Sequence, residues 1–199
     1  MEIGKDPQVI VLYDGYSKDE GTSMLANCTC TLIKGRTNIV IDTMTSWDGD
    51  RLTEALYKNG INCNQIEFVI CTHGHSDHIG CNYLFPKAVH IVGFCISQQY
   101  TYFYHDFQSG KEYVINDKVK VVPTPGHTLQ DVSVIVETDD GVVAITGDLF
   151  EKEEDLRDDS IWKSAGSDSQ ELQIINRKKI LDIADYIVPG HGPMFKVHK

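Results

Sequence analysis

The sequence feature that most constrains this chain is a run of metal-competent side chains directly after a predicted buried strand. Residues 68–72 are apolar or β-branched and indicate a strand, and the next six positions hold His73, His75, Asp77 and His78. In an extended segment, residues two apart point to the same side, so His73 and His75 can share one ion. Asp77 and His78 are adjacent and diverge, which favours a second ion beside the first. The alternative is a polar loop that carries surface histidines.

The same order of apolar run, turn residue and ligand-type side chain recurs further along the chain. It occurs at three places, which are His127 after residues 119–122, Asp148 after residues 142–146 and His191 after residues 186–188. A motif of this kind is a hypothesis that its structural context must support. Three further occurrences at predicted strand ends supply such a context.

These motifs resemble those of the metallo-β-lactamase superfamily. Thr72 to His78 resembles its H-x-H-x-D-H loop, and His127, Asp148 and His191 follow in the superfamily's ligand order. The resemblance covers nearly the whole chain. Periodicity favours an α+β class with two sheets between helices, and the resemblance implies a four-layer αββα sandwich. We expect a single domain over residues 1–199.

The resemblance implies a site for two metal ions. One ion is expected at His73, His75 and His127, the other at Asp77, His78 and His191, with Asp148 bridging them. Mixed imidazole and carboxylate ligands favour two Zn²⁺ ions, with iron or manganese as alternatives. The superfamily places an aspartate behind a ligand histidine in an Asp-Thr-Gly signature. Asp42 matches it, although Met44 replaces the glycine.

The implied chemistry is hydrolysis by a hydroxide held between the ions. Asp77 and Asp148 are the predicted catalytic residues, Asp77 by orienting the hydroxide and Asp148 by holding both ions. The sequence offers no clear protein acid for the leaving group.

Several functions share these motifs. A carboxylate at position 148 resembles the glyoxalase II and ribonuclease Z branches. Over its length the chain resembles an animal branch regarded as homodimeric zinc endoribonucleases of histone pre-mRNA processing, which implies cleavage of RNA phosphodiester bonds by a homodimer. The first alternative is a glyoxalase II-like thioesterase or another small-molecule ester hydrolase, although the helical glutathione-binding domain is not expected here. A single-iron persulfide dioxygenase and a partner-binding protein are further alternatives.

Charge argues against broad nucleic-acid binding. The formal net charge is −11, and non-specific binding to nucleic acid depends on basic surface. Bound dications can reverse the local electrostatic field in a cleft, so the net charge does not exclude a phosphate substrate. The acidic run 151–159 predicts a solvated loop, and residues 177–179 predict the solvated face of a helix. The candidates for phosphate contact are Lys111, Lys118 and Lys120, which also read as solvated strand residues.

The compartment is inferred from three absences in the sequence. The chain start lacks a basic segment followed by an apolar one, no apolar run approaches membrane-spanning length, and the six cysteines form no Cys-x-x-Cys motif. We therefore expect a reduced protein of the cytosol, and also of the nucleus, without a membrane partner.

The remaining pattern predicts the elements that surround the motifs. Strands are expected at 9–13, 67–72, 89–92 and 186–188, hairpins at 28–42 and 131–146, and helices at 50–59, from Asp77 to Leu84 and from Asp168 or Ser169 to Ala184. Asp77 is the expected N-cap of its helix. His90 and His105 are not expected to bind metal. The aromatic stretch 100–107 predicts either packing or a dimer contact, or a wall of the substrate cleft.

Overall fold

Two mixed β-sheets packed face to face form the centre of the computed structural model, which describes residues 6–198. The first sheet has seven strands, in the order β1 (Gln8–Tyr13), β4 (Cys30–Lys34), β5 (Ile39–Ile41), β6 (Phe68–Cys71), β7 (Val89–Val92), β8 (Cys95–Gln98) and β9 (Thr101–Phe103). The second has six, in the order β10 (Tyr113–Val114), β11 (Val119–Pro123), β12 (Val132–Thr138), β13 (Gly141–Gly147), β14 (Tyr186–Pro189) and β15 (Phe195–Lys196). The chain start, for which no export signal is predicted, lies outside the described residues up to position 5.

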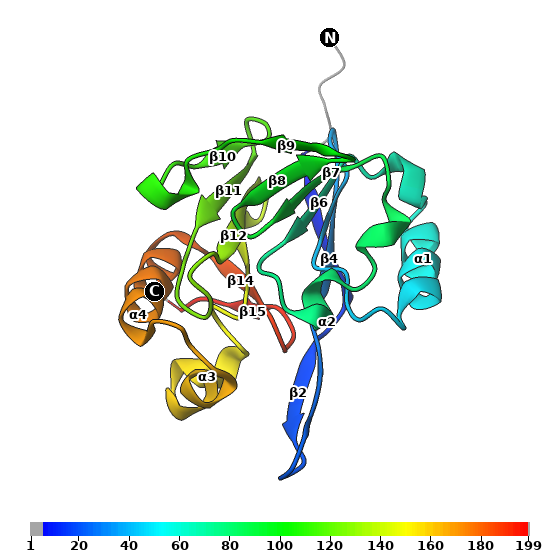
Figure 1. Cartoon of the computed structure of the whole chain (residues 1–199). Helices are drawn as coiled ribbons and strands as arrows, with labels where there is room; N and C mark the ends of the chain where they lie inside the picture. Colours follow the sequence, from blue (N-terminus) through cyan, green and yellow to red (C-terminus); the bar gives the residue numbers. More distant parts are fainter. Residues whose placement is uncertain (1–5, 199) are drawn as a thin grey trace.

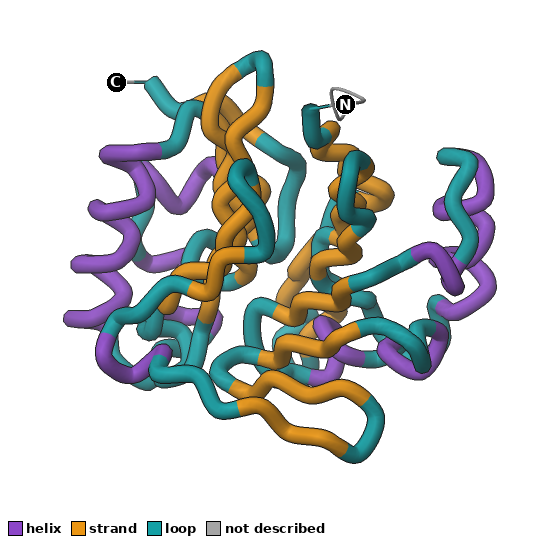
Figure 2. The backbone as a smooth tube through the Cα atoms, turned by 90° about the horizontal axis from the view of Figure 1, so that it is seen from above, coloured by secondary structure: helices purple, strands orange, loops and turns teal. Residues whose placement is uncertain are grey.

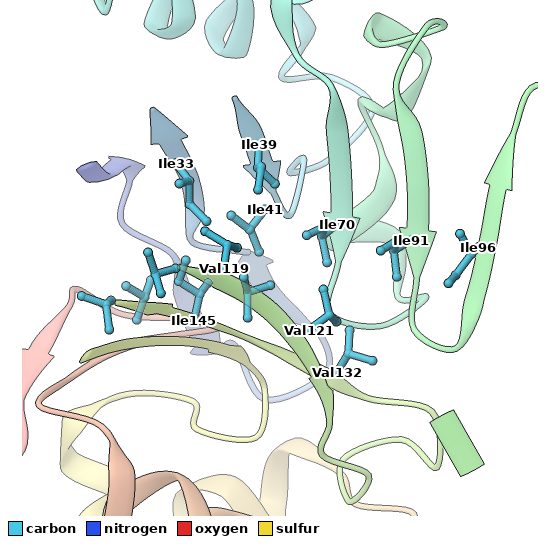
Figure 3. Packing of buried hydrophobic residues seen from close by; sticks show 14 of the residues in the cluster. Ile33, Ile39, Ile41, Ile70, Ile91, Ile96, Val119, Val121, Val132 and Ile145 are labelled. Atoms are coloured by element: carbon cyan, nitrogen blue, oxygen red, sulfur yellow. The ribbon is translucent and has the colours of Figure 1, made fainter. Parts of the chain in front are cut away.

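The core between the sheets follows the two-residue period of the strands. Ile33, Ile41 and Ile70 of the first sheet face Val121 and Ile145 of the second, and all five are buried (Figure 3). Side chains one position along, such as Leu32 and Val69, point to the other face of the first sheet. Each central strand is therefore buried on both faces.

Helices cover the two outer faces. Helix α1 (Gly49–Lys58) packs Leu52 and Leu56 on the first sheet, and α4 (Gln170–Ile183) packs Ile180 on the second. Figure 2 shows these helices outside the two bands of strands. The predicted αββα arrangement is confirmed. Ser169, one of the two predicted caps of α4, is its N-cap and accepts a hydrogen bond from the Leu172 N–H at 3.3 Å.

The helix predicted from Asp77 to Leu84 is wrong as one element. The chain forms the short α2 (Ser76–Ile79), with His75 rather than Asp77 as its N-cap, and then a separate 3-10 turn at Asn82–Leu84. The break follows from Gly80, whose N–H donates to the Met44 carbonyl at 2.8 Å. A Cβ on Gly80 would collide with the backbone of that neighbouring loop, so the packing of the loop ends the helix.

The sequence patterns did not predict several short strands. The pair β2 (Tyr16–Asp19) and β3 (Met24–Asn27) forms a hairpin that projects from the body (Figure 1), and β8, β9, β10 and β15 extend the sheets. Among residues 6–198, no helix is long and apolar enough to span a bilayer.

The prediction that residues 151–159 and 177–179 are solvated is wrong for three of them. Glu151, Asp155 and Arg177 are buried, and the Arg177 guanidinium donates to both Asp155 carboxylate oxygens at 2.8 and 3.1 Å. It also lies 4.2 Å from the centre of the Phe150 ring. A charge run in sequence cannot show a partner 22 positions away, and this partner allows the two charges to be buried.

Candidate metal centre

The predicted ligands come together at one edge of the sandwich because the apolar strand before each of them ends there. Strand β13 runs directly into Asp148, and β6 ends two residues before His73. Strand β11 runs toward the His127 turn, and β14 leads into the His191 turn. The Pro-Gly turn before His191 has a packing reason, since a Cβ at Gly190 would overlap the Asp148 carboxylate.

One cluster joins His73, His75, His127 and Asp148. One potential ligand atom from each lies within 4.8 Å of the others. His75 presents Nδ1, which is 2.8 Å from His73 Nε2 and 3.1 Å from His127 Nε2. The Asp148 Oδ2 atom lies 3.3 Å from His127 Nε2. This is the set expected for the first ion, together with the expected bridge.

The second cluster joins Asp77, His78 and His191 on the same 4.8 Å criterion. Asp148 reaches this cluster too, with Oδ1 3.3 Å from His78 Nε2 and Oδ2 3.3 Å from His191 Nε2. Asp77 Oδ2 is 3.7 Å from His191 Nε2. One buried carboxylate therefore contacts imidazoles of both clusters, which is the position expected of a bridging ligand.

Two independent observations indicate that these residues can bind metal ions. Tetrahedral zinc with bonds of about 2.0–2.1 Å holds its ligand atoms about 3.3 Å apart, close to the separations here. In addition, His78 Nε2 and Asp148 Oδ1 are buried and lie 3.3 Å apart, yet neither makes a hydrogen bond to any of the described residues. Buried polar atoms seldom stay unpaired, and both atoms point into the clusters. The imidazole and carboxylate donors suit a divalent transition metal.

Groups behind the imidazoles orient them. Asp42 Oδ2 lies 3.0 Å from His78 Nδ1, and its carboxylate also accepts a hydrogen bond from the Thr72 backbone N–H at 2.8 Å. His127 Nδ1 donates to the Gly166 carbonyl at 2.8 Å, and His191 Nδ1 donates to that of Asn27 at 3.1 Å. Each contact leaves Nε2 directed into the site. Met44, which replaces the glycine of the signature, adopts a positive φ of 58°, the left-handed region that glycine favours, and the contact between Asp42 and His78 forms without that glycine.

The electrostatics favour positive charge between the carboxylates. Burial lowers the pKa of His73 well below its usual value. Burial also disfavours charge on His78 and His191, but Asp148 outweighs it and raises the pKa of His191 to about 9 and that of His78 well above its usual value. Burial opposes ionisation of Asp148 as well, yet His78, His191 and His73 hold its pKa well below its usual range. The space between these carboxylates and imidazoles therefore favours positive charge, whether protons or metal cations supply it.

A cavity of about 240 Å³ opens onto both clusters. The hairpin contributes Ser17, Met24 and Ala26 to its wall, and the segment after Asp148 contributes Glu151. Burial, with the nearby Asp148 charge, raises the pKa of Glu151 to about 8. The hairpin residues and Glu151 are not among the predicted site residues. The sequence signal for Glu151 is its place three residues after the predicted ligand Asp148, at the start of the acidic run 151–159.

Other residues considered from the sequence lie elsewhere. His90 Nε2 donates to the Phe85 carbonyl, and His105 contacts the Phe107 and Tyr113 rings. The exposed aromatics of stretch 100–107 lie on and beside the edge strand β9, and no residue of that stretch is in the described lining of the cavity. Lys118 lies just before β11 and Lys120 near its start, whereas the opposite end of this strand leads to the site. Lys118 pairs with Glu137, and Lys120 pairs with Glu112. Lys111 is exposed and also absent from the described lining.

Comparison with known proteins agrees with the fold and the motifs. A model of the metallo-β-lactamase superfamily matches residues 25–191. Metallo-β-lactamase domain-containing protein 1 of Xenopus laevis is 42% identical over 200 residues, which cover 98% of this chain and 84% of that relative.

Solved structures show the same fold at low sequence identity. A metallo-β-lactamase-like protein of Thermotoga maritima has a TM-score of 0.71 and 23% identity, covering 96% of this chain and 99% of its own. AidC, a dizinc quorum-quenching lactonase solved with a product, has a TM-score of 0.61 and 16% identity, covering 85% and 73%. Since a family model spans most of the chain and a relative is 42% identical along nearly all of it, the chain belongs to the metallo-β-lactamase superfamily of metal-dependent hydrolases.

Proposed function

We propose that this protein is a dinuclear zinc hydrolase that cleaves RNA phosphodiester bonds. The observation that carries the dinuclear assignment is the Asp148 carboxylate, which contacts histidines of both clusters at 3.3 Å. His73, His75 and His127 would hold one ion and Asp77, His78 and His191 the other. Two bound ions supply water activation near neutral pH and charge neutralisation at the scissile group.

The chain's own residues prepare this chemistry. Asp42 holds His78, and backbone carbonyls hold His127 and His191, so the donor atoms need little rearrangement to bind. The Asp77 side chain is 19% exposed, which is more than that of Asp148, and it lies in the cavity wall. We assign Asp77 to orienting the attacking water and Asp148 to holding both ions.

Two features support RNA as the substrate. Paired cations suit a phosphodiester because they can neutralise its non-bridging oxygens while the attacking and leaving oxygens stay in line. The hairpin β2–β3 also extends from the body beside the cavity, which lengthens the wall along which a polymer can lie (Figure 1). With a net charge of −11, we expect loose and salt-dependent RNA binding.

A second candidate is hydrolysis of a small ester, thioester or lactone. The described wall of the 240 Å³ cavity contains no lysine or arginine to hold a phosphate backbone, and it includes the apolar Met24 and Ala26. The dizinc lactonase of similar fold acts on such a small molecule. The same pair of ions would serve acyl transfer, so the substrate must be decided by assay.

Metal content tests the dinuclear assignment first. Elemental analysis of the purified protein with saturating zinc should find about two ions per chain, as two clusters predict. A single iron, with no second ion taken up on titration, would instead indicate the dioxygenase alternative.

A substrate panel tests the reaction. Single-stranded RNA, S-lactoylglutathione and a chromogenic cephalosporin are compared for the wild type and for His75→Ala. We expect metal-dependent RNA cleavage that His75→Ala loses, with little cephalosporin turnover. Fast thioester turnover, with RNA cleavage no higher than in the variant, would reject the RNA proposal in favour of the small-molecule hydrolase.

A further inference from the structure

Glu151 places a carboxyl group at the cavity that neither ligand cluster uses. Its side chain lines the cavity with Asp148 and His191, yet the residue is only 2% exposed. Its Oε1 atom is buried and has no hydrogen-bond partner within residues 6–198. Neither cluster of potential ligand atoms includes it. A buried polar atom of this kind requires an explanation.

The backbone around Glu151 is held from two sides. Its N–H donates to Asp155 Oδ2 at 2.7 Å, and its carbonyl accepts from the His191 N–H at 2.8 Å. Asp155 is itself paired with the buried Arg177. The Asp155–Arg177 pair lies outside the ligand clusters, and His191 takes part through its backbone N–H rather than its imidazole, so these contacts hold the Glu151 backbone without using a potential ligand atom. The side chain therefore points from a rigid support into the site.

The chemistry of the carboxyl group restricts what it can contact. Non-bridging phosphate oxygens only accept hydrogen bonds, and a carboxylate repels them. A hydroxyl group both donates and accepts, so it can pair with a carboxyl group in either protonation state. An uncharged part of the substrate that carries a hydroxyl fits this position, and in RNA that part is the ribose.

We propose that Glu151 is a specificity residue that hydrogen-bonds the ribose 2′-hydroxyl next to the scissile phosphodiester. This inference rests on the proposed RNA cleavage and adds discrimination of RNA from DNA. Sites that hydrogen-bond a substrate hydroxyl reject analogues that lack it, because the buried partner is then left unpaired. The orphaned Oε1 atom is such a partner.

The test uses two oligonucleotides that differ in one atom. The wild-type cleavage position is mapped first, and the nucleotide on its 5′ side is then made 2′-deoxy in one copy of an otherwise all-ribose strand. With the zinc-loaded full chain, we expect kcat/KM to favour the ribose strand by at least about tenfold. Glu151→Ala should lower cleavage of the ribose strand to about that of the deoxy strand and leave the deoxy strand unchanged. Glu151→Gln, which keeps an acceptor oxygen, should retain part of the preference.

Glu154→Ala is the matched control, because it removes the same side chain from an exposed position of the same segment. Zinc content and Tm are measured for every variant. Equal loss on both strands, an unchanged preference in Glu151→Ala, or loss of zinc or Tm in that variant would overturn the 2′-hydroxyl assignment while RNA cleavage by the wild type stands. If the wild type cleaves neither strand, the proposed function itself fails and this inference fails with it.

Discussion

At the scale of the residue, Asp148 connects the two clusters of the candidate centre. Its two oxygens contact histidines of both clusters, and a buried carboxylate between imidazoles is stable only with positive charge around it. The adjoining Gly190 allows the carboxylate to fit, because a side chain there would overlap it.

Asp148→Ala should lose both ions and hydrolytic activity, since the substitution removes a donor from each cluster. His105→Ala should keep both, because His105 lies against Phe107 and Tyr113 instead. Elemental analysis together with an activity assay checks the pair. Unchanged metal content in Asp148→Ala would show that the bridge lies elsewhere.

Arg177 stabilises the segment that follows Asp148. Arg177→Met should leave Asp155 charged, buried and unpaired, and should lower the free energy of unfolding by about 3–5 kcal/mol. Lys178→Met, at the next and exposed position, should change it by less than about 0.5 kcal/mol. Urea denaturation at neutral pH measures both. Similar losses in the two variants would contradict a specific role for the buried pair.

At the scale of the element, the hairpin β2–β3 links the site to the protein surface. Its base supports a candidate ligand, because the Asn27 carbonyl accepts from His191 Nδ1. Further from this base, successive side chains of β3 point to opposite faces, so Met24 and Ala26 face the cavity and Leu25 faces away from it. One strand therefore contributes both to ligand orientation and to the cavity wall.

Met24→Ala should weaken substrate binding without affecting stability, since Met24 is largely exposed yet lines the cavity. Loss of about 1 kcal/mol of apolar contact corresponds to a rise in KM of about fivefold, with little change in kcat. Leu25→Ala is the matched control on the other face of the strand. Steady-state kinetics on the substrate identified by the panel measure both, and an equal effect of the two variants would argue against contact through Met24.

At the scale of the whole molecule, the two clusters connect the sheets. His73 follows a strand of the first sheet, whereas Asp148 and His191 follow strands of the second. Bound ions would therefore cross-link the two halves of the sandwich at one edge, where the core of isoleucine and valine ends.

Zinc should raise the Tm for this reason. At about 1,000 times its Kd, one bound ion adds about 4 kcal/mol, and for a chain of this size this corresponds to a Tm rise of about 8–16 °C. Differential scanning calorimetry with zinc and with a chelator measures the change. The Asp148→Ala variant should lack it, so a similar rise in that variant would indicate zinc binding elsewhere.

The homodimer and the single domain over residues 1–199 stay predictions at this scale. The edge strand β9 carries exposed aromatic side chains, including Tyr102 at 68% exposure, and such edges favour pairing with another chain. We expect sedimentation as a dimer, with Tyr102→Lys shifted toward monomer. A monomeric wild type, or a variant that dimerises equally well, would contradict this expectation.

The sequence by itself indicated two sheets between helices and ligand-type side chains at strand ends, and its resemblance to the metallo-β-lactamase superfamily implied the four-layer sandwich and the grouping of those side chains. Short continuous apolar runs mark strands that are buried on both faces, and the seven side chains stand in four short motifs at strand ends. These signals are local, so each can be read from a few neighbouring residues. The metal and catalytic roles of those side chains stay proposals that the experiments above test.

Only the tertiary structure decided the burial of Arg177 and Asp155, the break of the predicted helix at Gly80 and the place of Glu151 in the cavity. Each depends on a partner distant in sequence: Arg177 and Asp155 on each other, Gly80 on the loop at Met44, and Glu151 on Asp155 and His191. A charged side chain in sequence reads as solvated because burial costs free energy unless a partner is present. The sequence contains the partners, but only the fold brings them together.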